Sequence, residues 1–273
     1  MLNGLDLFSG YGGIGRALRP WVRTVAYCEI EQYCHGILVS EMSRGRIDRA
    51  PIWDDVRTLR REHISAPIDI ISGGFPCQDV SVAGNGKGLD GERSGLFFEV
   101  VRLACEFRPR FLFLENVPGL IVRGIDRVAA ELAANGYVGR YGVLSAYDVG
   151  APHLRERVWI AAYADSERCR QGSNRLTFSN GSSLADAGSK GLSLAGIEGG
   201  IRAQNGSGTS AGAERGSGSP RRTDWWATEP GVGRVVDGFT YRCDRIRALG
   251  NGVVPQTAEE AFKRLLGIER GWK

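Results

Sequence analysis

Apolar residues in the first 162 positions of the chain alternate between short continuous runs and helical repeats. The runs are typical of buried strands, and they occupy residues 4–8, 22–30, 68–75, 110–117 and 157–163. Apolar positions spaced i, i+3, i+4 and i+7 predict helices from Phe97 to Ala104 and from Ile125 to Leu132. This alternation predicts an α/β fold with a doubly wound, mostly parallel sheet, whose ligands bind at the carboxyl ends of the strands.

The composition changes after Tyr163, where glycine and serine become frequent and large apolar residues become scarce. Such a segment cannot build a core of its own. We therefore expect a main domain of residues 1–162 and 243–273, and a smaller, irregular and partly flexible region of residues 163–242. The stretch 253–267 predicts a final helix that rejoins the main domain, with Thr257 and Glu260 spaced as a capping box and Gly267 at its end.

Bulk properties narrow the class of protein only slightly. The net charge of +4 is compatible with a polyanionic partner without requiring one. The six cysteines never fall in a Cys-x-x-Cys pair and there are three histidines, so we expect reduced thiols and no metal site. No apolar run is long enough to span a membrane, and the first residues do not resemble a secretory signal, which together predict a cytoplasmic protein.

Gly10, Gly12 and Gly15 spell G-x-G-x-x-G between a predicted strand and a predicted helix. This is the position of the nucleotide-binding loop in Rossmann-like folds, because glycine lets the backbone approach a ligand closely. Glu29, at the end of the next predicted strand, is placed to accept hydrogen bonds from a ribose. NAD and S-adenosylmethionine both fit this pattern, and so does a tight turn without a ligand.

Three chemically distinct side chains follow or begin predicted strands, so they could converge on one edge of the sheet. Cys77 comes directly after Pro76, which fixes the backbone at the exit of a strand, and a glycine-rich loop follows. Glu115 ends the next strand, and Arg155 and Arg157 precede and open a later one. Inert packing of the thiol, a structural carboxylate and solvated arginines are the alternatives for these residues taken singly.

Taken together, these stretches resemble the DNA (cytosine-5) methyltransferases of bacterial or phage type, which share an ordered set of motifs. The matching stretches, in chain order, are "DLFSGYGGIG", "CEIE", "WDDV", "GGFPCQ", "ENV", "RERVW" and "LGNGVVP". Residues 163–240 occupy the place of the target-recognition region of that family. The order of the motifs makes the resemblance specific.

The resemblance implies S-adenosylmethionine as the cofactor. It assigns Glu29 to the ribose and Asp55 to the adenine amino group. The complete set of cofactor-binding residues that it implies is Phe8, Gly10, Gly12, Gly13, Glu29, Asp55, Val56, Pro76, Leu96, Asn251 and Val253.

The resemblance also implies a mechanism. Cys77 would add as thiolate to C6 of a flipped-out cytosine, and Glu115 would offset the charge that develops on the ring. Arg157 would contact the cytosine O2, while Arg155 would bind a phosphate or support the loop. Contacts to the DNA are implied for Gln78, Ser81 and Lys87.

The chain departs from the family pattern at His153, where glutamine is usual, at Ile30, where a bulky aromatic residue is usual, and at Gly252, where serine is usual. None of these changes removes a group implied in the reaction. We expect a monomer that acts on double-stranded DNA, with no membrane partner and with a restriction endonuclease, if there is one, acting separately. A tRNA cytosine methyltransferase, a non-catalytic DNA-binding relic and a dehydrogenase remain as alternatives.

Overall fold

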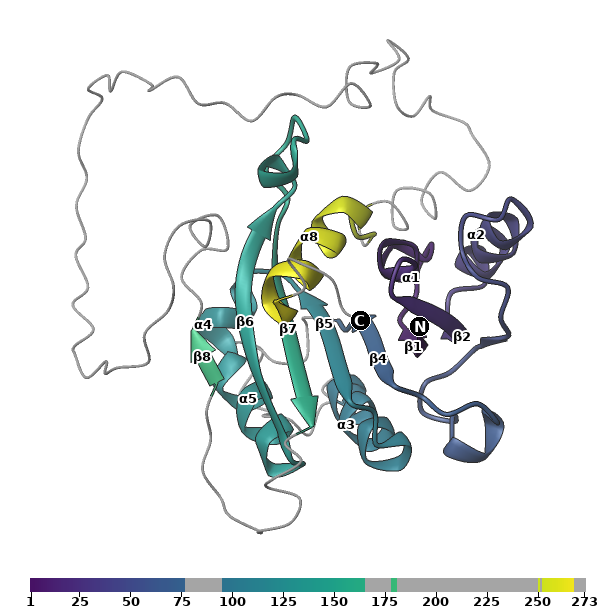
Figure 1. The fold of residues 1–273 in the computed structure, drawn as a ribbon, viewed down its shortest axis with the longest axis horizontal. Helices are drawn as coiled ribbons and strands as arrows, with labels where there is room; N and C mark the ends of the chain where they lie inside the picture. Colours follow the sequence, from purple (N-terminus) through teal and green to yellow (C-terminus); the bar gives the residue numbers. More distant parts are fainter. Residues whose placement is uncertain (77–94, 165–177, 181–249, 251, 268–273) are drawn as a thin grey trace, which may run out of the picture.

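The computed structural model describes residues 1–76, 95–164, 178–180, 250 and 252–267, and every structural statement below concerns these residues. Their strands form one sheet in the order β3-β2-β1-β4-β5-β7-β6-β8 (Figure 1). The strands are β1 (Leu2–Leu7), β2 (Val22–Cys28), β3 (Ile52–Trp53), β4 (Ile70–Gly74), β5 (Phe111–Asn116), β6 (Tyr137–Ser145), β7 (Glu156–Ala164) and β8 (Phe178–Asn180). The helices are α1 (Gly13–Leu18), α2 (Gln32–Ser43), α3 (Gly95–Phe107), α4 (Gly119–Arg123), α5 (Ile125–Ala134) and α8 (Pro255–Leu266), with short 3-10 helices η1 (Arg61–His63) and η3 (Tyr147–Val149).

The sheet is mostly parallel, as the sequence predicts. Strands β1, β2, β3, β4 and β5 pair in parallel, whereas β7 runs antiparallel to both of its neighbours, β5 and β6. Figure 1 shows this reversal, because the β7 arrow points opposite to those of β5 and β6. The start of β7 therefore lies beside the end of β5, with Asn116 paired to Val158.

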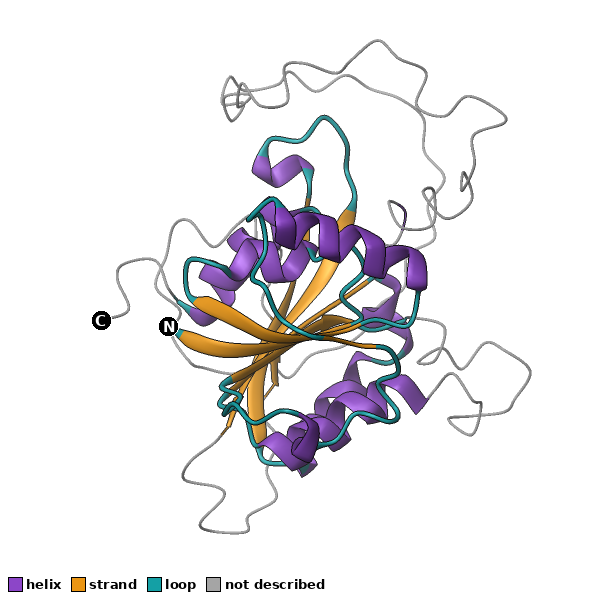
Figure 2. Cartoon of the chain, turned by 90° about the vertical axis from the view of Figure 1, so that its right-hand side faces the viewer, coloured by secondary structure: helices purple, strands orange, loops and turns teal. Residues whose placement is uncertain are grey.

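Helices cover both faces of the sheet (Figure 2). Helices α3 and α5 pack on one face with the larger apolar cluster, which includes Leu5, Ile71 and Leu114. Helices α1 and α8 pack on the other face, where Phe262 of α8 meets the Phe113 ring edge to face at 5.1 Å. Because β4, β5 and β7 each contribute buried side chains to both clusters, these central strands appear in the sequence as continuous apolar runs. The α/β fold is confirmed.

The two predicted amphipathic helices are present as α3 and α5. The final helix is also present and ends at Gly267, which adopts a left-handed conformation with a φ of 68°. The predicted capping box is wrong, because α8 begins at Pro255 and Thr257 lies within its first turn with a buried hydroxyl. Proline at the first position starts the helix three residues earlier than the box would, since its fixed φ is already helical. None of the helices described is long and apolar enough to cross a bilayer.

Candidate active site

The glycine-rich loop joins the end of β1 to the start of α1 through unusual backbone conformations. Gly10 and Gly12 have φ values of 53° and 82°, in the left-handed region that glycine tolerates best. Phe8 also has a positive φ, 51°, which is strained for an aromatic residue. The hydroxyl of Ser9 donates to the Asp6 carbonyl at 2.7 Å and stabilises this turn. Strained backbone of this kind is typical of ligand-binding loops.

The buried carboxylate of Glu29 lies directly against this loop, at the end of β2. Its Oε2 accepts a hydrogen bond from the Gly10 amide at 2.7 Å, and its Oε1 accepts one from the Glu31 amide at 2.8 Å. The side chain is 8% exposed. The acid that the sequence assigns to a ribose is therefore adjacent to the loop that the sequence assigns to the same ligand.

Glu115 and Arg157 form an ion pair at the carboxyl edge of the sheet. The Arg157 Nε donates to Glu115 Oε1 at 2.7 Å, across the antiparallel contact between β5 and β7. Glycine at position 74 makes room for this carboxylate, because a Cβ there would lie 2.7 Å from Glu115 Oε2. Burial raises the pKa of Glu115 from an ordinary 4.5 to about 7, and the positive charges of Arg157 and Arg155 oppose this rise only in part.

A pKa near 7 lets the Glu115 carboxyl group hold or release a proton close to neutral pH, which suits a general acid or a proton-sharing group. The next residue, Asn116, stabilises the chain just before Pro76, because its amide donates to the Phe75 carbonyl at 3.0 Å. The end of β4 is thereby held next to the end of β5. The position at which the chain continues toward residue 77 is fixed by this bond.

Arg155 contacts the segment that precedes α8. Its Nη2 donates to the Gly250 carbonyl at 2.6 Å and to the Gly252 carbonyl at 2.5 Å. Burial, and to a lesser extent the charge of Arg157, lower the pKa of the Arg155 guanidinium. These hydrogen bonds fix Arg155 to the segment before α8, and its two predicted roles, binding a phosphate or supporting the loop, stay predictions.

A narrow pocket lies among the glycine loop, the ends of β4 and β5, and the segment before α8. Five residues predicted from the sequence line it, namely Phe8, Gly10, Gly13, Glu115 and Val253. The sequence assigned no role in the site to the other residues of its lining, of which only Gly252 was noted, as a departure from the family pattern; these residues are Asp6, Ser9, Tyr11, Ile14, Gly74 and Gly252. The glycine loop and the Glu115 carboxylate, which lie more than 100 positions apart in sequence, thus share one pocket.

Asp6 is the most deeply buried polar residue of this lining. Its Oδ1 accepts a hydrogen bond from the Ser72 hydroxyl at 2.8 Å, across the β1–β4 pair. Burial raises the pKa of Asp6 from 3.8 to about 7. The single acidic position among the apolar residues of β1 was the signal that could have identified it.

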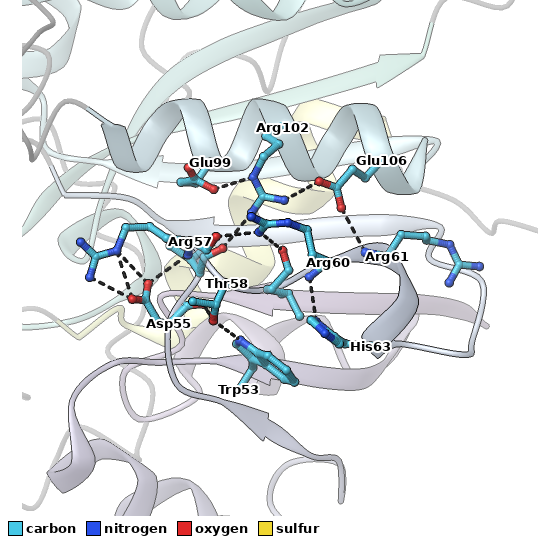
Figure 3. A network of polar contacts seen from close by, with 12 residues as sticks. Trp53, Asp55, Arg57, Thr58, Arg60, Arg61, His63, Glu99, Arg102 and Glu106 are labelled. Atoms are coloured by element: carbon cyan, nitrogen blue, oxygen red, sulfur yellow. Dashed lines mark hydrogen bonds and ion pairs between the residues drawn. The ribbon is translucent and has the colours of Figure 1, made fainter.

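The predicted adenine-binding acid belongs to a separate polar network (Figure 3). Arg57 donates to both carboxylate oxygens of Asp55, from its Nε at 3.0 and 3.1 Å and from its Nη2 at 2.9 Å. These hydrogen bonds lower the pKa of Asp55. Arg102 of α3 donates to the Val56 carbonyl at 2.9 Å and also pairs with Glu99 and Glu106 of its own helix. The segment that carries Asp55 is therefore fixed to α3.

The remaining predicted site residues divide into three groups. Gly12 lies behind the loop, where a Cβ would approach Leu38 and Ile47, and Leu96 packs on the apolar cluster of α3. Pro76 is exposed at the end of a described range. Five predicted residues lie outside the described residues, as does most of the predicted target-recognition region; these residues are Cys77, Gln78, Ser81, Lys87 and Asn251.

Comparison with known proteins identifies the family. The model of the C-5 cytosine-specific DNA methylases matches residues 2–187, which is more than half of the chain. The chain belongs to this family. The match includes the glycine loop, Glu115 and Arg157, and the remainder of the pocket lies in the segment before α8.

Individual Type II methyltransferases are similar to this chain over 164 to 177 residues. The Type II methyltransferase M.Bsp6I of Bacillus sp. is 36% identical over 177 residues, covering 61% of this chain and 54% of the relative. The Type II methyltransferase M.HhaI of Haemophilus parahaemolyticus is 30% identical over 164 residues, covering 58% and 48%. The chain spans about half the length of the curated relatives that it matches.

Solved structures agree with this assignment. A DNA modification methyltransferase encoded within a prophage of E. coli has a TM-score of 0.51 and 30% identity, covering 62% of this chain and 48% of that one. DNMT2 of Spodoptera frugiperda has the same TM-score at 19% identity, covering 61% of this chain and 51% of that one. The second likeness is one of fold alone.

Proposed function

We propose that this C-5 cytosine methylase family member transfers a methyl group from S-adenosylmethionine to C5 of a flipped-out cytosine in a specific sequence of duplex DNA. The observation that carries the proposal is the Glu115–Arg157 ion pair, whose buried carboxylate lines the same pocket as the glycine loop. We further propose that residues 163–242 recognise the sequence and that the protein acts as a monomer, separately from any restriction endonuclease.

The residues of the pocket fit S-adenosylmethionine as a cofactor. The Glu29 carboxylate suits the ribose of such a ligand, and the open backbone of Gly10 beside it suits the methionine chain. The aromatic Phe8 suits the adenine-bearing end. When bound, the cofactor supplies an electrophilic methyl group on a sulfonium. Asp55 and Val56 would hold its adenine, and Asn251 and Val253 would close the pocket.

Each remaining step uses side chains of the chain itself. The Cys77 thiolate adds to C6 of cytosine, which makes C5 nucleophilic. The Glu115 carboxyl group shares a proton with N3, and its pKa of about 7 keeps that proton available at neutral pH. Arg157, held by its ion pair with Glu115, contacts the cytosine O2. After methyl transfer, loss of the C5 proton expels the Cys77 sulfur and restores the aromatic ring.

The base must leave the duplex for these steps, at a cost on the order of a few kcal/mol. Gln78, Ser81 and Lys87, on the loop after Cys77, are proposed to contact the DNA during this step. Arg155 would support the site through the carbonyls of Gly250 and Gly252 rather than touch the base.

A methyl-transfer assay tests the proposal. Purified protein is incubated with S-adenosylmethionine carrying a labelled methyl group and with either plasmid DNA or bulk tRNA, and the modified base is identified after digestion. We expect 5-methylcytosine in the DNA, and Cys77→Ser should abolish it. Methylation of tRNA alone would refute the substrate, and a fully active Cys77→Ser variant would refute the covalent mechanism.

A further inference from the structure

Tyr11 occupies a tightly enclosed position between the two segments that line the pocket. Its hydroxyl group donates a hydrogen bond to the Val253 carbonyl, 242 residues away in sequence. On one side of the ring lies Gly13, where a Cβ would be 3.3 Å from Tyr11 Cε2 and 2.9 Å from the Val253 carbonyl oxygen. The glycine loop and the segment before α8 therefore meet through this one side chain.

Gly252 lies on the other side of the same ring. A Cβ at this position would be 2.8 Å from Tyr11 Cδ1, 2.9 Å from Cζ and closer still to Cε1. Cβ atoms do not approach ring carbons this closely, so any side chain at 252 must displace the phenol. Gly252 stands where the related enzymes usually have serine, and Tyr11 fills the space that this serine would take.

The backbone of the same segment also accepts hydrogen bonds from Arg155, through the carbonyls of Gly250 and Gly252. Tyr11 and Arg155 thus both contact this segment, and Glu115 lies close enough to both for their charges to interact. Burial raises the pKa of the Tyr11 phenol, so this group stays a hydrogen-bond donor at neutral pH.

We infer that Tyr11 is a positioning residue. Its ring packs in the space left by the missing side chain of Gly252, and it thereby sets the position of residues 252–253 relative to the cofactor site. The inference rests on the proposed function, because the site that the segment closes is the proposed S-adenosylmethionine site. Its distinctive consequence is that the effect of serine at 252 depends on residue 11: the serine is harmful while residue 11 is an aromatic ring, and harmless once the ring is gone.

The test is a set of four proteins, namely wild type, Gly252→Ser, Tyr11→Leu and the double variant. The melting temperature is measured without ligand, the Kd for S-adenosylmethionine by calorimetry, and the Kd for duplex DNA by fluorescence anisotropy. We expect Gly252→Ser to weaken cofactor binding about tenfold, because overpacking forces the ring out of its site. In the Tyr11→Leu background the same serine should leave binding within about threefold of Tyr11→Leu alone.

Two further variants separate the causes. Tyr11→Phe keeps the ring, so it should not rescue Gly252→Ser. Gly36→Ser is the matched control, because Gly36 is exposed and a Cβ there has nothing within 4 Å. It should leave the melting temperature and both Kd values at wild-type levels.

The outcomes distinguish the inference from the proposed function. Wild-type cofactor affinity in Gly252→Ser, or equal effects of the serine in both backgrounds, would overturn the pairing. If the serine lowers the melting temperature only in the presence of the Tyr11 ring but leaves cofactor affinity unchanged, the positioning role is overturned; a loss of DNA affinity of equal size would overturn it as well. If the wild-type protein binds no S-adenosylmethionine while the serine still lowers the melting temperature only in the presence of the ring, the proposed function fails and the packing of Tyr11 against Gly252 stands.

Discussion

The protonation of Glu115 should make the stability of the fold depend on pH. Because burial raises the pKa of this group, the folded protein binds its proton more tightly than the unfolded chain does. The resulting stabilisation is complete below the unfolded pKa of about 4.5 and is lost as the pH rises through the folded pKa of about 7. A rise from 4.5 to about 7 corresponds to about 3 kcal/mol, at about 1.4 kcal/mol for each pH unit.

Glu115→Gln removes this dependence while keeping the shape of the side chain and an oxygen that can accept from Arg157. We expect the variant to be more stable relative to wild type at high pH: the difference in the free energy of unfolding, variant minus wild type, should be about 3 kcal/mol larger at about pH 8.5 than at about pH 4.5. Urea denaturation across this range measures the difference. Asp6 also titrates near pH 7, but it is present in both proteins and therefore cancels.

Glu62→Gln is the control, because the Glu62 side chain is 82% exposed and the change removes the same charge. Its stability should follow that of wild type across the pH range. A constant difference between Glu115→Gln and wild type, within about 1 kcal/mol, would show that folding does not raise the pKa of Glu115 and would refute the argument from burial. In that case the carboxyl group could not act as a proton donor near neutral pH.

Three further predictions concern the surroundings of the site. Gly74→Ala should reduce methyl transfer by up to about 100-fold, measured as kcat, because the new methyl group displaces the neighbouring carboxylate, and unchanged kcat would contradict this. Asn116→Ala should lower the free energy of unfolding by about 1–3 kcal/mol in urea denaturation, because the Phe75 carbonyl loses its donor. Arg57→Ala should strengthen binding of S-adenosylmethionine about threefold by calorimetry, because it frees the Asp55 carboxylate; weaker binding would oppose a role for Asp55 in binding adenine.

The sequence predicts those strands that are buried on both faces. β4 and β5 appear as continuous apolar runs because each contributes side chains to the clusters on both sides of the sheet. β6 escapes prediction because Gly139, Arg140 and Gly142 interrupt its apolar positions, and it forms through pairing with β7 along its whole length. Tertiary pairing overrides the weak local preference there.

The candidate site, like the sheet, contains some features that can be predicted from the sequence and others that cannot. Glu115 and Arg157 can be named from the sequence because each ends or opens an apolar run, but the direction of β7, which brings them together, depends on pairing that no local pattern encodes. Tyr11 could not be predicted, since its partner Val253 lies at the other end of the chain. A bulky aromatic residue inside a glycine loop was the only local signal.

The position of α8 has a consequence for biosynthesis. Its residues complete the apolar cluster over Ile70, Phe113 and Trp159, and the segment before it closes the pocket, yet both leave the ribosome after every strand of the described sheet. A nascent chain that already carries the glycine loop and Glu115 therefore leaves the part of this face that α8 covers exposed until α8 emerges. The pocket is complete only then, so ribosomes stalled before residue 250 should hold a chain that exposes an aromatic surface and does not bind the proposed cofactor.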